Sequence, residues 1–519
     1  MAMRRSVRRF QVVGLVLFML VVFMVVGVAA ADNIKITILY TNDEHGWLQP
    51  FVAYKSPITE GGAANLMGRF TQIEGYSTDA DGFLLLSGGD NWTGPSISTW
   101  FEGEPVVEVM NVMGYDAAAI GNHEFDFGRE LLNRRIAQAD FPYLSANIYY
   151  AGTHDLADFA TPYIIKEAGG VKVGIIGLTT TETVTSTHPK NIGDLEFGSY
   201  EEALSREVPK MRAEGAELIV VLAHVPSPEI VSLARAVSDL DVALILGGHD
   251  HVTFTGRLGD TLLMEAGWAM RYYGKVELFL DPLTHDVVDY TMEVVPNQYV
   301  TEEGNPVPPD PTVETIVNYW QAKTDEAMGE VIGYTETGMP RGSWKQANYV
   351  LDSWLWAYPQ ADFAMTNWGG FRADIPAGEI TVGDIVSMLP FDNTIVDCAI
   401  TGAQLVENLE VRPAAVAGFT YTYHKEGENI VVDSVTLPDG SPVDMTKVYH
   451  VLVNDFMYAG GDGFLFGEQD PNAYDTSIQW RQPVIDWTKA QNTSPANPID
   501  ALIDDQPRAE EVGVPVEQP

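Results

Sequence analysis

The sequence has only one cysteine, Cys398, among 519 residues. A single cysteine excludes any disulfide within the chain. The residue lies in the apolar run TIVDCAI. This setting indicates a buried, chemically inert thiol and argues against a cysteine nucleophile.

Positive charge is also scarce, with 30 lysines and arginines against 72 aspartates and glutamates and a net charge of −42. A phosphate backbone needs compensating cations, so this balance argues against nucleic acid binding through a basic surface. The acidic excess is spread along the chain, which suits a heavily solvated surface in a salty or extracellular medium. The sequence shows no internal repeats.

What remains is typical of a globular protein, because 46% of the residues are hydrophobic and 10% are aromatic. A chain of 519 residues exceeds a single ordinary hydrophobic core, so we expect two domains.

The first 31 residues resemble an export signal. Arginines at 4, 5, 8 and 9 precede an apolar run at 12–31, which ends in three alanines. This pattern predicts a signal peptide at 1–31. The apolar run is long enough to span a bilayer, so an uncleaved N-terminal anchor is the alternative. Either way we expect a secreted, periplasmic or cell-surface protein, whose only membrane contact is this segment.

Five strand-like apolar runs between residues 34 and 294 end in possible metal ligands, as expected of an α/β layered domain. Sites gather at the carboxyl ends of strands in such sheets, so these ends can converge on one place. Five of the 10 histidines directly follow such runs. The runs lie at 36–40, 83–86, 117–120, 218–222 and 242–246, and are followed by Asp43 and His45, by Asp90, by Asn122 and His123, by His224, and by His249 and His251.

The motif GNHEFDFG combines amide, imidazole and carboxylate groups within a few residues. Asn122 and His123 are adjacent, so at the tip of a strand their side chains point to opposite sides of the backbone. One side chain can then hold a metal while the other works beside it. Asp126 is near enough to hydrogen-bond the imidazole and to orient it.

Oxygen and imidazole donors without a thiolate suit divalent zinc, manganese or iron. The set is too large for a single tetrahedral ion with an open position. Two ions about 3.5–4 Å apart that share a carboxylate would accommodate it. Asp90 is the candidate bridge. The predicted ligands are Asp43, His45, Asp90, Asn122, His224, His249 and His251.

In this order, the motifs TNDEHG, GGDNWTG, GNHEFDFG and GGHDH, together with the lone His224, resemble the calcineurin-like metallophosphoesterases. The similarity is greatest to the secreted 5′-nucleotidase and UDP-sugar hydrolase branch. It implies a four-layer α-β-β-α sandwich over 32–295, followed by a smaller α/β (α+β) substrate-binding domain. One departure is Tyr40, which stands where the family often has histidine and is not an expected ligand.

By the resemblance, Asp90 is shared between two divalent ions, with zinc or manganese the first candidates. His123, oriented by Asp126, would stabilise the transition state and protonate the leaving oxygen. The other ligands of one ion would be Asp43, His45 and His251, and those of the second would be Asn122, His224 and His249.

Residues 296–310 are rich in proline and read as a linker. Asp310, Pro311 and Thr312 predict the capped start of a helix that extends to about residue 328. By the resemblance, 311–505 is a 5′-nucleotidase C-terminal domain. Residues 506–519 form a polar tail without a lipid-anchor signal.

Three stretches of the C-terminal domain resemble the substrate pocket of the family: TNWGGFRADIPAGEIT, LPFDNTI and AGGDGFLFG. They imply that Asn367 and Arg372 bind substrate and that Phe464 stacks on a base; Arg341 is a further candidate phosphate contact. Arginine offers a planar, charged fork that suits phosphate, and every base offers a π-face. Two departures are Trp368 in place of a glycine, and 412–415, which has no aromatic where a second stacking ring is expected.

Together these features predict an exported enzyme that hydrolyses nucleoside 5′-phosphates to nucleoside and phosphate by in-line attack of a metal-activated water. Alternatives within the fold are hydrolysis of 2′,3′-cyclic nucleotides, of UDP-sugars or of sulfur–sulfonate bonds. Outside enzymes, the alternative is an exported nucleotide- or metal-binding surface protein. The oligomeric state is left open.

Overall fold

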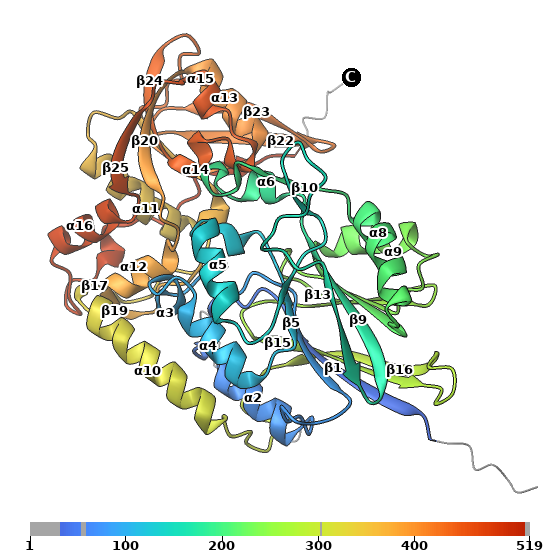
Figure 1. Cartoon of the computed structure of the whole chain (residues 1–519). Helices are drawn as coiled ribbons and strands as arrows, with labels where there is room; N and C mark the ends of the chain where they lie inside the picture. The colour runs from blue at the N-terminus through green and yellow to red at the C-terminus, as the bar shows by residue number, and fades with distance from the viewer. Residues whose placement is uncertain (1–31, 53–58, 302–303, 514–519) are drawn as a thin grey trace, which may run out of the picture.

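The computed structural model describes residues 32–52, 59–301 and 304–513 (Figure 1). The export segment expected at 1–31 lies outside these residues, as does the end of the predicted tail, 514–519. Within the described ranges, no helix has both the length and the hydrophobicity needed to cross a membrane.

Two six-stranded mixed sheets form the centre of the N-terminal domain. The first has the order β16 (Val287–Pro296), β15 (Tyr272–Leu280), β1 (Ile34–Thr41), β4 (Phe83–Ser87), β5 (Ala117–Ala119) and β6 (Tyr143–Leu144). The second has the order β13 (Thr253–Leu258), β14 (Thr261–Ala266), β12 (Leu244–Leu246), β11 (Leu218–His224), β9 (Val171–Thr179) and β8 (Tyr163–Ala168). Two short pairs accompany them: β2 (Phe51–Val52) with β3 (Thr59–Glu60), and β7 (Ile148–Tyr150) with β10 (Leu195–Phe197).

Helices cover the outer faces of both sheets, with α8 and α9 on one side and α2, α4 and α10 on the other (Figure 1). The predicted four-layer α-β-β-α sandwich is therefore confirmed. The helices of this part are α2 (Ala63–Gln72), α3 (Ser96–Thr99), α4 (Glu104–Met113), η1 (His123–Phe125), α5 (Arg129–Gln138), α6 (Thr183–Ser186), α7 (Pro189–Ile192), α8 (Tyr200–Ala213), α9 (Ser227–Ala236) and α10 (Pro311–Met328).

The central strands read as continuous apolar runs because both of their faces are buried. In β11, Leu218, Val220 and Leu222 point into the core between the two sheets. The alternating residues Ile219 and Val221 pack under α8 and α9 instead. This packing fixes which side chains of the strand face each core.

The C-terminal domain is a smaller α/β unit, as predicted. Its five-stranded sheet has the order β21 (Ala415–Ala417), β18 (Phe363–Thr366), β24 (Val448–Asn454), β20 (Thr394–Thr401) and β25 (Tyr474–Gln479). Two smaller sheets are β17 (Val331–Thr335) with β19 (Gly378–Thr381), and β23 (Asn429–Thr436), β22 (Thr420–Glu426) and β26 (Ala509–Glu511). Its helices are α11 (Trp344–Ala357), η2 (Trp368–Gly370), α12 (Val382–Met388), α13 (Gly402–Val411), α14 (Asp455–Tyr458), η3 (Gly461–Gly463), α15 (Phe466–Gln469), α16 (Gln482–Gln491) and η4 (Ile499–Ala501).

Helix α10 begins and ends where the sequence predicts, and the Asp310 side chain caps it by accepting from the backbone N–H groups of Thr312 and Val313. Its apolar face packs against α2 and α4 and joins the core of the N-terminal domain. The described part of the linker is tied to the same helix α2, because the Arg69 guanidinium donates to the carbonyls of Gln298 and Val300. The domain limits drawn at 310 and 311 stay a prediction.

The predicted polar tail contributes a strand. β26 pairs in parallel with β22, with Ala509 opposite Tyr421. Cys398 is buried and free, as predicted, and burial raises the pKa of its thiol.

Candidate metal centre

The five predicted runs are β1, β4, β5, β11 and β12, and their carboxyl ends meet between the two sheets. Within each sheet these strands pair in parallel: β1 pairs with β4 and β4 with β5 in the first sheet, and β11 pairs with β12 in the second. The side chains that follow them therefore gather at one edge. The seven predicted ligands come together there, and the role of each stays a prediction.

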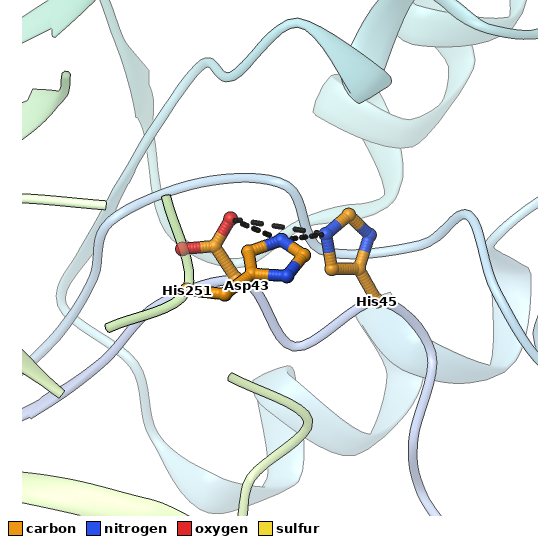
Figure 2. A group of neighbouring side chains, drawn as sticks. All are labelled: Asp43, His45 and His251. Atoms are coloured by element: carbon orange, nitrogen blue, oxygen red, sulfur yellow. Dashed lines mark hydrogen bonds and ion pairs between the residues drawn. The ribbon is translucent and has the colours of Figure 1, made fainter. Parts of the chain in front are cut away.

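Asp43, His45 and His251 form a first group that could hold a metal ion (Figure 2). The Nε2 atoms of the two histidines face each other at 3.0 Å. The Oδ1 atom of Asp43 lies 3.4 Å from His251 Nε2 and 3.8 Å from His45 Nε2. Three donor atoms thus converge from two segments that are about 200 residues apart in the sequence.

The two oxygens of Asp43 have different surroundings. Oδ2 accepts from the Asn42 side chain at 2.6 Å and from the His249 backbone N–H at 3.0 Å. Oδ1 is buried and has no hydrogen-bond partner among the described residues. A buried carboxylate oxygen that accepts no hydrogen bond is costly unless a cation balances its charge. The donors of this group therefore fit a divalent ion.

Asp90, His224 and His249 form a second group. His224 Nε2 lies 3.1 Å from Asp90 Oδ2 and 3.2 Å from the amide oxygen of Asn122. Burial alone would lower the pKa of His224, but the neighbouring carboxylates, Asp90 first and then Asp43 and Glu124, together raise this pKa to about 10. His224 Nδ1 lies 2.9 Å from the carbonyl of Gly88, which orients the ring.

Asp90 joins the two groups. Its Oδ2 atom lies 3.9 Å from His45 Nε2 and 4.0 Å from His123 Nε2, so it also belongs to a third group with these histidines. Burial would raise the pKa of Asp90, but His224 and His123 hold this pKa well below its usual range. Clustered aspartates and histidines that share one carboxylate are consistent with a dinuclear metal site.

The backbone at this edge is unusual. Five of the seven predicted ligands adopt the left-handed region, which non-glycine residues visit at an energetic cost. The surrounding structure must impose these conformations, and strain of this kind concentrates at functional sites. The residues are Asp43 (φ 51°), His45 (φ 44°), Asp90 (φ 58°), His249 (φ 86°) and His251 (φ 61°).

The placement of Asn122 and His123 at a strand tip is wrong. β5 ends at Ala119, and His123 begins the single 3₁₀ turn η1, with Asn122 in helical conformation before it. In a 3₁₀ turn the side chains of residues i and i+3 lie above one another. His123 and Asp126 therefore meet, with Nδ1 and Oδ2 2.7 Å apart. Burial would lower the pKa of His123, but Asp126 and Asp90 raise it overall.

Two glutamates inside the quoted motifs had no predicted role, yet they tie the ligand loops together. Glu124 accepts the backbone N–H groups of Gly121, Asp90 and Asn91 at 2.6, 2.8 and 2.7 Å. Glu44 accepts from the hydroxyls of Thr41 and Ser87 and from the Asn91 amide. Both carboxyls are buried. Each of these glutamates closely follows the end of an apolar run in the sequence. This position is the sequence feature that could have identified them.

Tyr40 and Glu182 also support the centre. Tyr40 is buried, and its hydroxyl donates to the carbonyl of Gly247 at 2.5 Å, which links β1 to the loop that follows β12. A Glu182 oxygen lies 3.1 Å from His249 Nε2, so this carboxylate can orient the imidazole. Nothing in the sequence connects Glu182 with His249, because 67 residues separate them.

A cavity of about 520 Å³ lies between the metal centre and the C-terminal domain. Of the predicted substrate residues, Asn367 and Arg372 line it. Arg372 reaches the metal centre, with Nη2 3.0 Å from His45 Nε2. Asn367 donates to Asp462 at 2.9 Å and accepts from Asn454 at 3.0 Å.

The stacking role expected for Phe464 disagrees with the structure. Its ring is only 2% exposed and packs in the C-terminal core beside Phe466. Among the described residues, neither Phe464 nor Arg341 lines the cavity. A glycine-rich turn precedes Phe464, and the sequence does not show to which side of such a turn a ring points.

Other aromatic rings face the cavity instead. Phe391 and Phe456 both line it, and Phe391 stacks with the His123 imidazole at a centroid distance of 5.7 Å. Phe391 lies in LPFDNTI, one of the three stretches that resemble the substrate pocket of the family, and this position could have identified it. At 412–415, Arg412 takes the cavity position and pairs with Asp462 at 2.9 Å. Trp368 turns towards Trp344 in the C-terminal core.

Comparison with known families supports this two-part organisation. Residues 331–468 match the family model described as "5′-nucleotidase, C-terminal domain". Residues 85–255, which carry four of the five ligand-bearing strand ends, match the model "Bacterial capsule synthesis protein PGA_cap".

Individual relatives are similar over most of the chain. The 5′-nucleotidase of Vibrio cholerae is 27% identical over 90% of this chain and 92% of its own length. The crystal structure of a 5′-nucleotidase precursor from Thermus thermophilus has a TM-score of 0.80 and 26% identity, and covers 93% of this chain and 100% of its own.

Other relatives are longer than this chain. The chain spans 64% of the cell wall protein Lmo0130 of Listeria monocytogenes, to which it is 27% identical over 84% of its own residues. It spans 37% and 32% of two relatives from Bacillus subtilis.

Proposed function

Because the chain belongs to the 5′-nucleotidase family, with a metallophosphoesterase N-terminal domain and a 5′-nucleotidase C-terminal domain, we propose that it hydrolyses nucleoside 5′-phosphates to nucleoside and phosphate. One observation carries the proposal. Two groups of aspartates and histidines, joined at Asp90, open onto a cavity whose opposite wall holds two arginines and two phenylalanines.

The seven predicted ligands would hold two divalent ions, with zinc or manganese as the candidates that suit imidazole and carboxylate donors. When bound, such ions supply a water nucleophile at neutral pH and positive charge for the phosphate oxygens. Asp90 would contact both ions, since its Oδ2 atom lies between the two groups.

His123 would deliver the proton to the leaving 5′-oxygen. Its Nδ1 atom is engaged by Asp126 at 2.7 Å, which leaves Nε2 on the side of Asp90 and the cavity. Asp126 and Asp90 raise the pKa of the imidazole and so favour its protonated form. A protonated imidazole beside the reacting group is a suitable general acid.

The C-terminal wall would bind the rest of the substrate. Arg372 carries a planar, charged fork next to His45, in the right place to hold a phosphate that reaches the metal centre. Phe391 and Phe456 provide aromatic faces on which a base can stack. This assignment replaces Phe464 as the stacking ring.

The protein would work outside the cytoplasm, as the sequence at 1–31 indicates. Its acidic, well-solvated surface suits a salty or extracellular medium.

The test is a metal titration of purified apoprotein with AMP as substrate. We expect phosphate release to appear with zinc, manganese or cobalt and to saturate near two ions per chain. His285→Ala is the matched control, because this histidine pairs with Glu217 away from the cavity. No phosphate release with any of the three metals would overturn the proposal.

A substrate panel separates the alternatives within the fold. AMP, a 2′,3′-cyclic nucleotide, a UDP-sugar and a sulfur–sulfonate ester are compared at equal metal loading. We expect the highest kcat/KM for the 5′-monophosphate. Tight AMP binding by calorimetry without turnover would instead favour a nucleotide-binding surface protein.

A further inference from the structure

The turn at 267–270 connects β14 to β15 and so joins the two N-terminal sheets beside the first group of ligands. Gly267, Ala269 and Met270 have positive φ angles of 78°, 59° and 53°. For alanine and methionine this conformation costs energy and persists only where the surroundings impose it. The turn carries Trp268, whose position is therefore set by the backbone.

The surroundings that impose the turn are the ligand-bearing segments themselves. The Asn42 amide donates to the carbonyl of Gly267 at 2.6 Å, and the Ala269 N–H donates to the carbonyl of Asp43 at 2.8 Å. From the other segment, Val252, which directly follows His251, accepts from the Gly267 N–H at 2.8 Å. Trp268 is thus anchored to both segments that build the first group.

The indole of Trp268 lies parallel to the imidazole of His251, with centroids 5.4 Å apart and an angle of 11° between the planes. Offset stacking of this kind is favourable and restricts rotation of the smaller ring. His251 Nε2 must point towards His45 and Asp43 for the group to hold an ion. The stack therefore selects the orientation that metal binding needs.

The same indole supports a residue of the other domain. The guanidinium carbon of Arg341 lies 4.6 Å from the Trp268 ring centroid, within the range of a cation–π contact. Arg341 Nε donates to the carbonyl of Phe371, directly before Arg372. Burial and the Arg372 charge lower the pKa of Arg341 to about 9, so the group stays protonated at neutral pH.

We infer that Trp268 is a positioning residue that fixes the His251 imidazole for metal binding and holds Arg341 against the N-terminal domain. Through this one ring the metal centre is coupled to the segment that carries Arg372. The inference rests on the proposed function, because it requires an ion at the group of Asp43, His45 and His251. Arg341 acts here through Trp268, and not as a residue that lines the cavity.

The first test measures Co²⁺ binding to full-length apoprotein by calorimetry and visible absorption. We expect Trp268→Ala to weaken one of two sites on the order of tenfold and to change its absorption band, as loss of a supporting residue does. The site of His224 and His249 should keep its affinity. Trp268→Phe retains an aromatic face and should restore most of the affinity.

Trp356→Ala is the matched control, because this tryptophan is half-exposed on α11 and lies outside both groups. Two unchanged Co²⁺ sites in Trp268→Ala would overturn the inference and leave the proposed function standing. Equal weakening of both sites together with a lower melting temperature would also overturn it, since that pattern reports a general loss of structure. Wild-type protein that binds no ion would overturn both proposals.

The second test addresses the coupling to Arg341 through the affinity of metal-loaded protein for inorganic phosphate. Trp268→Ala and Arg341→Ala should each weaken phosphate binding. Because both act through one contact, the double variant should lose no more than the larger single loss. Fully additive losses would contradict the coupling.

Discussion

The two walls of the cavity are built in different ways. The N-terminal wall consists of strand-end loops with left-handed backbones, pinned by buried groups such as Glu124, which accepts three backbone N–H bonds. The C-terminal wall consists of short turns whose polar side chains hold one another, as Asn367 and Arg412 hold Asp462.

This difference corresponds to a difference in expected role: catalysis for the N-terminal wall and substrate recognition for the C-terminal wall. Buried backbone-to-side-chain bonds in a low-dielectric interior fix atoms closely and are costly to lose. Side-chain pairs at a solvent-accessible cavity, such as the exposed Arg412 with Asp462, contribute much less and can rearrange. We therefore expect substitutions in the N-terminal wall to change kcat, metal binding or folding, and substitutions in the C-terminal wall to change KM.

The largest expected effect is that of His123→Ala. Loss of the general acid should lower kcat by about 10²- to 10⁴-fold. Both metals should remain bound, because the predicted ligands are unchanged. Kinetics with AMP combined with metal analysis of the purified variant checks this. Loss of one metal would instead identify His123 as a ligand.

Phe464→Ala and Phe456→Ala compare a ring in the core of the C-terminal domain with a ring that lines the cavity. Phe464 is buried among apolar side chains, so its truncation should lower the free energy of unfolding by about 3–5 kcal/mol. Phe456→Ala should instead raise KM for AMP, because the substrate loses one stacking contact worth about 1–3 kcal/mol of binding free energy. Denaturant unfolding and kinetics on both variants give the comparison. A raised KM confined to Phe464→Ala would restore that residue as the stacking ring.

Glu124→Ala tests whether the loops of the N-terminal wall depend on the buried hydrogen bonds that Glu124 accepts. Three backbone N–H groups would lose their acceptor, which should lower the free energy of unfolding by roughly 1–3 kcal/mol. Metal affinity should fall as well, because the Asp90 loop would loosen. The exposed Glu428→Ala is the control and should stay within about 0.5 kcal/mol of wild type. Equal stability of the two variants would contradict the pinning role.

Asp126→Asn should give the smallest effect, a displaced pH profile. Asp126 contributes to the raised pKa of His123, so removing its charge should lower that pKa. The protonated imidazole then disappears at lower pH, and the alkaline limb of kcat should move in the same direction. A pH series of kcat on both proteins measures the displacement. An unmoved limb would assign the limb to another group.

Prediction from sequence succeeded where position along a strand determines position in space. His224 and Asp90 were predicted to meet because both follow buried runs, and parallel strands bring such ends to one edge. The sequence did not show that a 3₁₀ turn begins at His123, directly after Asn122, since a one-turn element leaves almost no periodic signal.

In the C-terminal domain, position along a strand does not determine where the aromatic rings point. Phe391, Phe456 and Phe464 all lie near turn residues, and nothing local distinguishes a ring in the cavity from a ring in the core. The direction of each ring depends on contacts with segments far away in the chain. Trp268 is a further example, because its partners His251 and Arg341 belong to different domains.

The sequence by itself determined the chemistry of the centre: oxygen and imidazole donors placed after five buried strands, with one aspartate available for sharing. Burial on both faces of those strands imposes their apolar pattern, and the pattern can be read directly. Only the tertiary structure decided which aromatic rings face the cavity and which residues hold the ligands in place. Those choices depend on packing between distant segments, which leaves no periodic trace in the chain.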